Sequence, residues 1–202
     1  MIQENEIEEI TKLPGEFRGS AFATDMAYVL KHAGKEGLEK LEAKLSSWKH
    51  PIAYERIKKA IWYPIGLQVL SLLAAEEVFG WTEKDIHDMG YLGPENSFTM
   101  KIVLKHFVGL KKTYQQSPFI WSSHYSVGRL VNPDLKEEGE EKHAVFQIFD
   151  FKIHPVLCTY LAGYILKLCE LTLHDKKRIT SFEETRCTFR GDECHEFIAK
   201  WK

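Results

Sequence analysis

In roughly the first 115 residues, hydrophobic positions recur every three or four residues, which is the spacing of an α-helix. Residues 21–33 carry one apolar face, and Gly34 then predicts a stop. Pro64 and Gly80 enclose the most apolar run of the chain, so we expect a buried helix between them. A further apolar stripe at residues 98–108 extends the helical pattern. The first half is therefore predicted to be helical.

The pattern changes after residue 116, where β-branched and aromatic residues become frequent, as they are in strands. The expected strands are residues 119–131, 143–153, 179–189 and 194–201. A helix is expected from Pro155 to about Leu173, between the two pairs of strands. This order predicts an α+β fold in which a helical N-terminal half packs on a four-stranded antiparallel sheet, with one long helix between the two hairpins.

The length of 202 residues fits a single domain, with a helical part at 1–116 and an α/β part at 117–202. A net charge of −2 offers no basic surface for a polyanion, so nucleic-acid binding is not expected. The apolar run from Pro64 to Phe79 is too short to span a bilayer and contains Glu76 and Glu77. The acidic N-terminus does not resemble a signal peptide. We expect a cytoplasmic protein with no membrane span.

All four cysteines lie in the last 45 residues, and reduced thiols gathered in this way favour a metal site over disulfides. Cys158 falls in the first turn of the helix after Pro155, where the helix dipole favours a thiolate. Glu184, Cys187, Cys194 and His195 bracket one tight turn farther on. Cys169 is set aside, because it lies roughly 16 Å along the helix from Cys158.

The register of the last hairpin decides which of these side chains meet. A loop centred on Gly191 places Cys187 opposite His195, whereas a loop one residue longer places it opposite Glu196. Only one of Cys194 and His195 can face Cys187 in a regular strand. Glu184 would point to the other face unless a β-bulge intervenes.

The segments CTYLAGY, ETRC and GDECHEFIAKW in residues 117–202 resemble the 4-vinyl reductase domain family. That family includes sensor domains of aromatic-responsive bacterial regulators, and its fold is similar to small subunits of the TRAPP trafficking complex. The resemblance implies a structural zinc held by Cys158, Glu184, Cys187 and a fourth ligand. The family's last cysteine falls on His195, so His195 takes the fourth place, Cys194 replaces it in a shifted register, or the metal is lost. Four protein ligands make a structural site.

The resemblance also implies an apolar or aromatic small molecule bound between the helices and the sheet, and a homodimer. Side chains suited to line such a cavity are Trp62, Phe107, Trp121, His124, Tyr125, Phe146 and Phe149. His106 is a second histidine that is able to orient a polar group of the ligand. The main hypothesis is therefore a small-molecule sensor with structural zinc.

Enzymatic function is not expected, because the sequence has no nucleophile elbow, phosphate loop or dinucleotide fingerprint. One alternative is a TRAPP-like scaffold protein that holds an apolar or acyl ligand permanently. The other is a haem-based gas sensor, since HYSVGR resembles the Tyr-x-Ser-x-Arg element of haem nitric-oxide sensors. Its spacing here is Tyr-Ser-x-x-Arg, so we expect haem not to be the cofactor.

Overall fold

The structure is a computed structural model that describes residues 2–96, 109–173 and 178–202. Its N-terminal helices are α1 (Glu4–Thr11), α2 (Ser20–Ser47), α3 (Ile65–Phe79) and α4 (Glu83–Asn96), with the 3₁₀ turn η1 (Tyr54–Arg56) after α2. The short strands β1 (Glu16–Arg18) and β2 (Trp62–Pro64) pair antiparallel beside them. Gly34 interrupts α2 with a positive φ of 69°, and Gly80 ends α3 in the left-handed conformation, as the sequence predicted. The stripe predicted at 98–108 lies outside the described residues.

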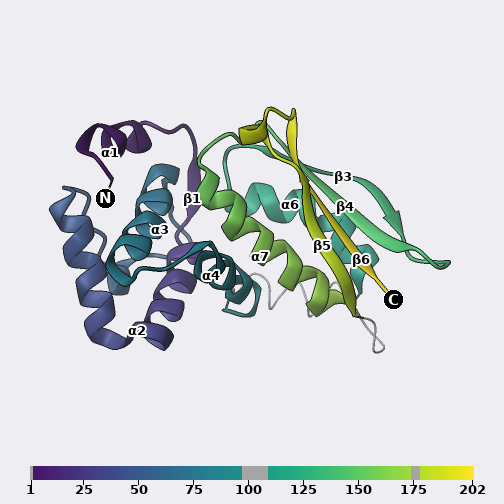
Figure 1. Cartoon of the computed structure of the whole chain (residues 1–202), viewed down its shortest axis with the longest axis horizontal. Coiled ribbons are helices and arrows are strands. Elements are labelled where there is room, and N and C mark those ends of the chain that lie inside the picture. The colour runs from purple at the N-terminus through teal and green to yellow at the C-terminus, as the bar shows by residue number, and fades with distance from the viewer. Residues whose placement is uncertain (1, 97–108, 174–177) are drawn as a thin grey trace.

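The C-terminal part begins with α6 (Leu110–His124) and continues through β3 (Arg129–Lys136), β4 (Lys142–Phe149), α7 (Pro155–Thr172), β5 (Ile179–Arg186), the 3₁₀ turn η2 (Thr188–Arg190) and β6 (Cys194–Trp201). The strands form one antiparallel sheet in the order β3-β4-β6-β5, so each hairpin contributes one edge strand. Figure 1 shows α1, α2 and α3 at one end of the molecule, α4 beside α7 in the middle, and the sheet at the other end. The predicted fold class is confirmed.

One predicted strand was wrong in its first half. Residues 119–124 continue α6, and strand structure begins only at Arg129. Six buried side chains at helical spacing place one face of α6 inward, namely Leu110, Thr113, Tyr114, Ser117, Ile120 and Trp121. Phe119 points outward instead, with 71% of its surface exposed. Burial of that face prevails over the strand preference of the aromatic residues and over Pro118. The predicted boundary at residue 116 therefore falls inside a helix.

Helix α7 holds the two ends of the molecule together. It contacts β5, β6 and α6 at the sheet, and it packs against α4 of the helical part (Figure 1). The crossing with α4 is close because both helices carry a glycine there. A Cβ added to Gly90 would lie 1.9 Å from the Tyr160 carbonyl oxygen, and one added to Gly163 would lie 2.0 Å from that of His87. Backbone contacts this close fix the position of α7 relative to the helical part.

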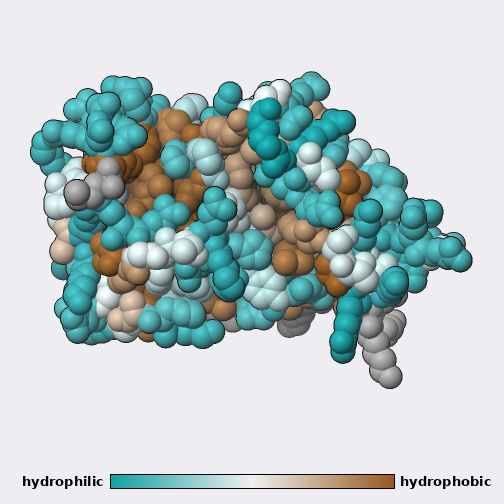
Figure 2. All heavy atoms as spheres, in the orientation of Figure 1, coloured by the Kyte–Doolittle hydropathy of each residue, from teal (hydrophilic) through white to brown (hydrophobic). Residues whose placement is uncertain are grey.

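Buried hydrophobic residues of both parts form one continuous cluster, which includes Phe22 and Leu72 from the helices and Phe146 and Phe197 from the sheet. On the face shown in Figure 2, hydrophobic atoms gather over α3 beside α1, whereas the sheet end is mainly hydrophilic. None of the helices in the described ranges is long and apolar enough to cross a membrane.

Candidate functional site: an internal cavity and a Cys-Glu-His cluster

A mainly apolar cavity of ≈ 70 Å³ lies where the helical part meets α6, α7 and the sheet. Ser117, Ile120, Trp121 and His124 of α6 form one wall at helical spacing. The opposite wall comes from α7 and includes Tyr160, Leu161, Tyr164, Ile165 and Leu168. Phe17, Arg18 and Thr24 close the cavity from the N-terminal side. The cavity thus forms between segments that are far apart in the sequence.

Several residues predicted to bind the ligand meet at this cavity, and others do not. Trp121, His124, Tyr125 and Phe146 line it. The guanidinium carbon of Arg18 lies 4.0 Å from the centroid of the Trp62 ring. The guanidinium carbon of Arg129 lies 5.0 Å from the centroid of the Phe149 ring. Neither Trp62 nor Phe149 is part of the wall. His106 and Phe107 lie outside the described residues.

His124 is held in one orientation at the end of α6. Its Nδ1 lies 2.9 Å from the Ile120 carbonyl oxygen, which can only accept a hydrogen bond, so Nδ1 carries the proton. Burial, assisted by the positive charge of Arg18, lowers the pKa of His124 below its usual value. The ring is therefore neutral, and Nε2 keeps its lone pair. A neutral imidazole with Nδ1 bonded to a backbone carbonyl is the usual arrangement of a metal-binding histidine.

Sequence reasoning missed the polar groups contributed by other elements. Tyr160 and Tyr164 of α7 line the cavity, and the Tyr164 hydroxyl is buried with no hydrogen-bond partner among residues 2–96, 109–173 and 178–202. Arg18 brings a cation, whose Nε donates to the Ser123 carbonyl oxygen at 3.1 Å. The YLAGY segment signals Tyr160 and Tyr164 only through their spacing on one helix face, and no local pattern marks Arg18.

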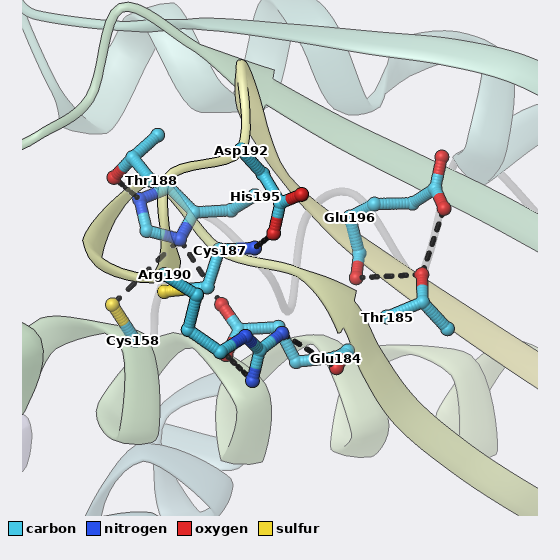
Figure 3. Close-up of polar contacts among 9 residues, drawn as sticks. All are labelled: Cys158, Glu184, Thr185, Cys187, Thr188, Arg190, Asp192, His195 and Glu196. Atoms are coloured by element: carbon cyan, nitrogen blue, oxygen red, sulfur yellow. Dashed lines mark hydrogen bonds and ion pairs between the residues drawn. The ribbon is translucent and has the colours of Figure 1, made fainter.

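A second cluster lies at the N-terminal end of α7, where the last hairpin meets the helix. Cys158, Glu184, Cys187 and His195 each offer one ligand atom, and these four atoms all lie within 4.8 Å of one another. Figure 3 shows the two sulfur atoms and the His195 ring pointing toward one another. A metal ion at about 2.0–2.3 Å from each donor needs donors separated by no more than about 4.6 Å. A small contraction of this cluster meets that requirement.

The hydrogen bonds of His195 direct one ring nitrogen at the cluster. Nε2 lies 2.9 Å from the Phe151 carbonyl oxygen, so Nε2 carries the proton and donates it there. Nδ1 faces the cluster, with Glu184 Oε1 at 3.0 Å and Cys158 Sγ at 3.7 Å. It donates to the Glu184 carboxylate when it is protonated, and it offers its lone pair to a cation when it is not. A backbone carbonyl that fixes the tautomer in this way is the expected support for a metal-binding histidine.

A β-bulge resolves the difficulty with Glu184. The pairing of β5 with β6 shifts between Glu184 and Arg186, and this extra residue turns Glu184 to the same side as Cys187. Arg190 donates to the Glu184 carbonyl oxygen at 3.0 Å, and the Cys187 amide donates to Asp192 at 2.8 Å. These bonds hold the turn around the cluster (Figure 3).

Cys194 does not join the cluster. It is buried next to His195 on β6, and successive side chains of a strand point to opposite faces. The sequence predicted a thiolate at Cys158, but without a bound cation the surrounding protein favours the protonated thiol. Burial, together with Cys187 and Glu184, raises the pKa of the Cys158 thiol well above its ordinary value. The helix dipole is the weaker influence there, and a bound cation would reverse the balance.

No family model matches the sequence, and no curated protein does so either. Solved structures match the fold over 92% of the chain. An H-NOX protein from S. oneidensis in the Fe(II)NO ligation state is 11% identical, is covered over 99% of its length, and has a TM-score of 0.68. An oxygen-binding H-NOX domain related to soluble guanylate cyclases is 12% identical, is covered over 94%, and has a TM-score of 0.60.

A third structure, described as modulating haem redox potential through porphyrin distortion, is 10% identical and is covered over 99%, with a TM-score of 0.53. These similarities establish a shared fold. They correct the resemblance drawn from the sequence, because the neighbours are H-NOX proteins and not 4-vinyl reductase or TRAPP proteins. The predicted zinc-containing sensor of aromatic ligands is wrong on the same finding, and so is the exclusion of haem.

The family and ligand were inferred from short segments around cysteines, and such segments reflect local structure rather than the ligand that the complete fold binds. The similarity to H-NOX structures carries no information on the predicted metal-binding residues Cys158, Glu184, Cys187 and His195. They stay a prediction, without a named metal.

Proposed function

We propose that this chain is a haem-binding sensory domain whose signal is a small gas molecule. The observation that carries the proposal is the likeness of 92% of the chain to H-NOX structures described with Fe(II)NO and with oxygen. His124 supports it independently, since a neutral histidine is a common axial ligand of haem iron.

The cavity wall offers donor groups suited to haem, but the cavity volume is smaller than haem requires. Among the described wall residues, His124 offers the imidazole and Arg18 offers a cation for a carboxylate of the macrocycle. The volume of ≈ 70 Å³ is small beside the about 300–1,000 Å³ of pockets that enclose drug-sized ligands. Haem uptake therefore requires wall side chains such as Trp121 and Tyr125, which stack on each other, to move outward.

When bound, haem supplies the iron that takes up the gas. The side chains of the protein hold the haem and determine which molecules reach it. His124 Nε2 is the proposed iron ligand, and the Ile120 carbonyl keeps the imidazole in the required tautomer. Apolar side chains such as Ile120, Leu161 and Ile165 exclude water from the cavity. Tyr160 and Tyr164 of α7 form part of the cavity wall, and the Tyr160 hydroxyl donates to Asp25 on α2.

The first prediction concerns haem uptake. Purified protein titrated with haemin should give a Soret band, and His124→Ala should weaken haem binding at least about tenfold. His143→Ala on β4 is the matched control, because His143 pairs with Asp134 away from the cavity. His106→Ala tests the other candidate histidine. A wild-type protein that takes up no haem would overturn the proposed function, and full binding by His124→Ala would overturn the choice of ligand.

We further propose that Cys158, Glu184, Cys187 and His195 bind a metal ion that fixes the last hairpin to α7. The convergence of their four ligand atoms favours this second role. Two thiolates and an imidazole suit a soft or borderline transition metal rather than Mg²⁺ or Ca²⁺. Because four protein ligands close the coordination shell, the role is structural.

The second prediction uses Co²⁺ as the probe. The reduced protein should bind a single equivalent with absorption bands of thiolate–cobalt bonds, and His195→Ala and Cys158→Ala should each weaken binding at least about tenfold. Cys169→Ser and Cys194→Ser are the matched controls, since both thiols lie outside the cluster. The absence of thiolate bands, or their loss in Cys194→Ser but not in His195→Ala, would refute the assignment. Sedimentation velocity on the same samples tests the predicted homodimer.

A further inference from the structure

Asp25 is a carboxyl group in the interior that has one hydrogen-bond partner among the described residues. It lies on α2, its surface is 1% exposed, and its Oδ1 accepts a hydrogen bond of 3.1 Å from the Tyr160 hydroxyl. Its other oxygen, Oδ2, is buried and has no hydrogen-bond partner within the part of the chain that the structure describes. A buried charge with so little compensation is costly, and such groups are found where the protein uses them.

Tyr160 connects this carboxyl group with the cavity. It lies on α7 and forms part of the cavity wall, while its hydroxyl reaches Asp25 on α2. A phenol has one proton to donate. While Tyr160 donates that proton to Asp25, it offers only lone pairs to a molecule in the cavity. The direction of this one hydrogen bond therefore decides what the wall presents to a ligand.

We propose that Asp25 sets the hydrogen-bonding role of Tyr160, so that Tyr160 donates to a cavity ligand only when Asp25 carries a proton. Protonation takes one proton from solvent and gives Asp25 a hydroxyl group, which donates to the Tyr160 oxygen. The Tyr160 proton is then free to turn into the cavity. The ligand selected by the protonated state is one with a hydrogen-bond acceptor. This inference rests on the proposed function only in taking the cavity as the ligand site.

The surroundings of Asp25 allow it to change protonation at ordinary pH. Burial raises the pKa of Asp25 to about 7, and the Tyr160 hydrogen bond opposes that rise. The other groups that face it are Tyr54 of η1 and Tyr125 at the end of α6, both uncharged phenols. The acidic residues of α4 act on Tyr28 farther along α2 and not on Asp25. Within the described residues, no cation acts on this carboxyl group.

The test follows the Tyr160 hydroxyl directly. Protein labelled with ¹³C at the tyrosine ζ carbon is titrated by NMR, and the Tyr160 signal is assigned by its loss in Tyr160→Phe. We expect this signal to move in one step centred near pH 7 and to stay fixed across the range in Asp25→Asn, where the amide cannot titrate. Tyr28, also on α2, is the internal control and should show no step centred there. No step in the wild type, or an unchanged step in Asp25→Asn, would overturn the inference.

A second measurement protects the test against a variant that does not fold. The Asp25 γ carbon, observed in wild type and in Tyr160→Phe, should titrate at a higher pH in the variant, because the hydrogen bond that favours the carboxylate is lost. An unchanged midpoint would contradict the link between the two residues.

The effect of Asp25 protonation on a ligand in the cavity is measured with carbon monoxide bound to haem as the probe. Its C–O stretching frequency should shift with the same midpoint in wild type and not in Asp25→Asn. If the protein takes up no haem but both NMR results hold, the proposed function fails and the hydrogen-bond switch stands. If haem–CO forms and its frequency is independent of pH, the effect of Asp25 on the ligand is refuted.

Discussion

At the scale of single residues, two histidines are oriented by the same local means, a hydrogen bond from one ring nitrogen to a backbone carbonyl. The Ile120 carbonyl fixes the proton of His124 on Nδ1, and the Phe151 carbonyl fixes that of His195 on Nε2. Each ring is left with its opposite nitrogen available to a cation, although His195 Nδ1 also lies within hydrogen-bonding distance of Glu184. The choice of nitrogen follows from where the accepting carbonyl lies, at the preceding turn of α6 in one case and in the β4–α7 connection in the other.

Asp25 should also leave a mark on stability. Its pKa lies at about 7 in the folded protein against an ordinary 3.8, so only the folded state holds the proton between these values. Stability should therefore fall as pH rises from about 4 to about 7 and level off above it. A pKa difference of about three units, at about 1.4 kcal/mol per unit, limits this loss of folding free energy to about 4 kcal/mol.

The measurement is the free energy of unfolding in urea at several pH values. The free energy of unfolding of wild type should fall relative to that of Asp25→Asn as pH rises from 4 to 8, because only wild type loses the Asp25 proton. Glu39→Gln, an exposed carboxyl group on the same helix, should leave the pH profile of wild type unchanged. A parallel profile for Asp25→Asn and wild type would contradict the buried titration.

At the scale of elements, α7 carries both sites. Its first turn supplies Cys158 to the cluster, and later turns supply Tyr160 and Tyr164 to the cavity. The position of α7 depends on its close crossing with α4 at Gly90 and Gly163. Small changes at that crossing are therefore expected to reach both sites.

Gly163→Ala tests the crossing. The added Cβ would lie 2.0 Å from the His87 carbonyl oxygen, so one backbone must shift. Overpacking of this kind costs about 1–3 kcal/mol, and we expect a lower free energy of unfolding by at least that range. Ala162→Ser, half-buried beside it, should change stability by no more than about 0.5 kcal/mol. Equal stability of Gly163→Ala and wild type would show that the helices tolerate separation.

At the scale of the whole molecule, the two sites are connected through Phe151. Its carbonyl accepts the His195 hydrogen bond, and its ring packs edge-on against Trp121 and Tyr125 of the cavity wall, with centroids 5.1 Å and 5.6 Å apart. Phe151, Trp121 and Tyr125 belong to the continuous core that joins the helical part with the sheet. One core shared by both parts favours cooperative unfolding.

We therefore expect urea unfolding to occur in a single transition. Far-UV circular dichroism, dominated by the helices, and fluorescence of the tryptophans should give coincident curves, because no part can lose its core alone. Trp121→Phe, which removes one emitter at the junction, should shift the midpoint without separating the two curves. Two resolved transitions would mean that the helical part and the sheet unfold independently.

The sequence determined the local elements well where one physical signal dominated. The apolar run between Pro64 and Gly80 became α3, and the alternating segments after residue 141 became β4 and β6. The hairpin argument gathered Glu184, Cys187 and one of Cys194 and His195 around a single turn and left the register open, because a tight turn limits where its two ends can go. The full set with Cys158 and His195 came from the resemblance, and the structure brings these four ligand atoms within 4.8 Å of one another. These features depend on contacts within or between adjacent elements.

Tertiary structure alone decided the rest. Residues 119–124 are helical because one face of α6 is buried, and the bulge before Arg186 turns Glu184 toward Cys187. Arg18, Asp25 and Tyr160 meet near one cavity only because β1, α2 and α7 pack together there. Periodicity reports which face of an element is apolar, whereas the partner that covers that face, and the space left between them, depend on packing across the whole chain.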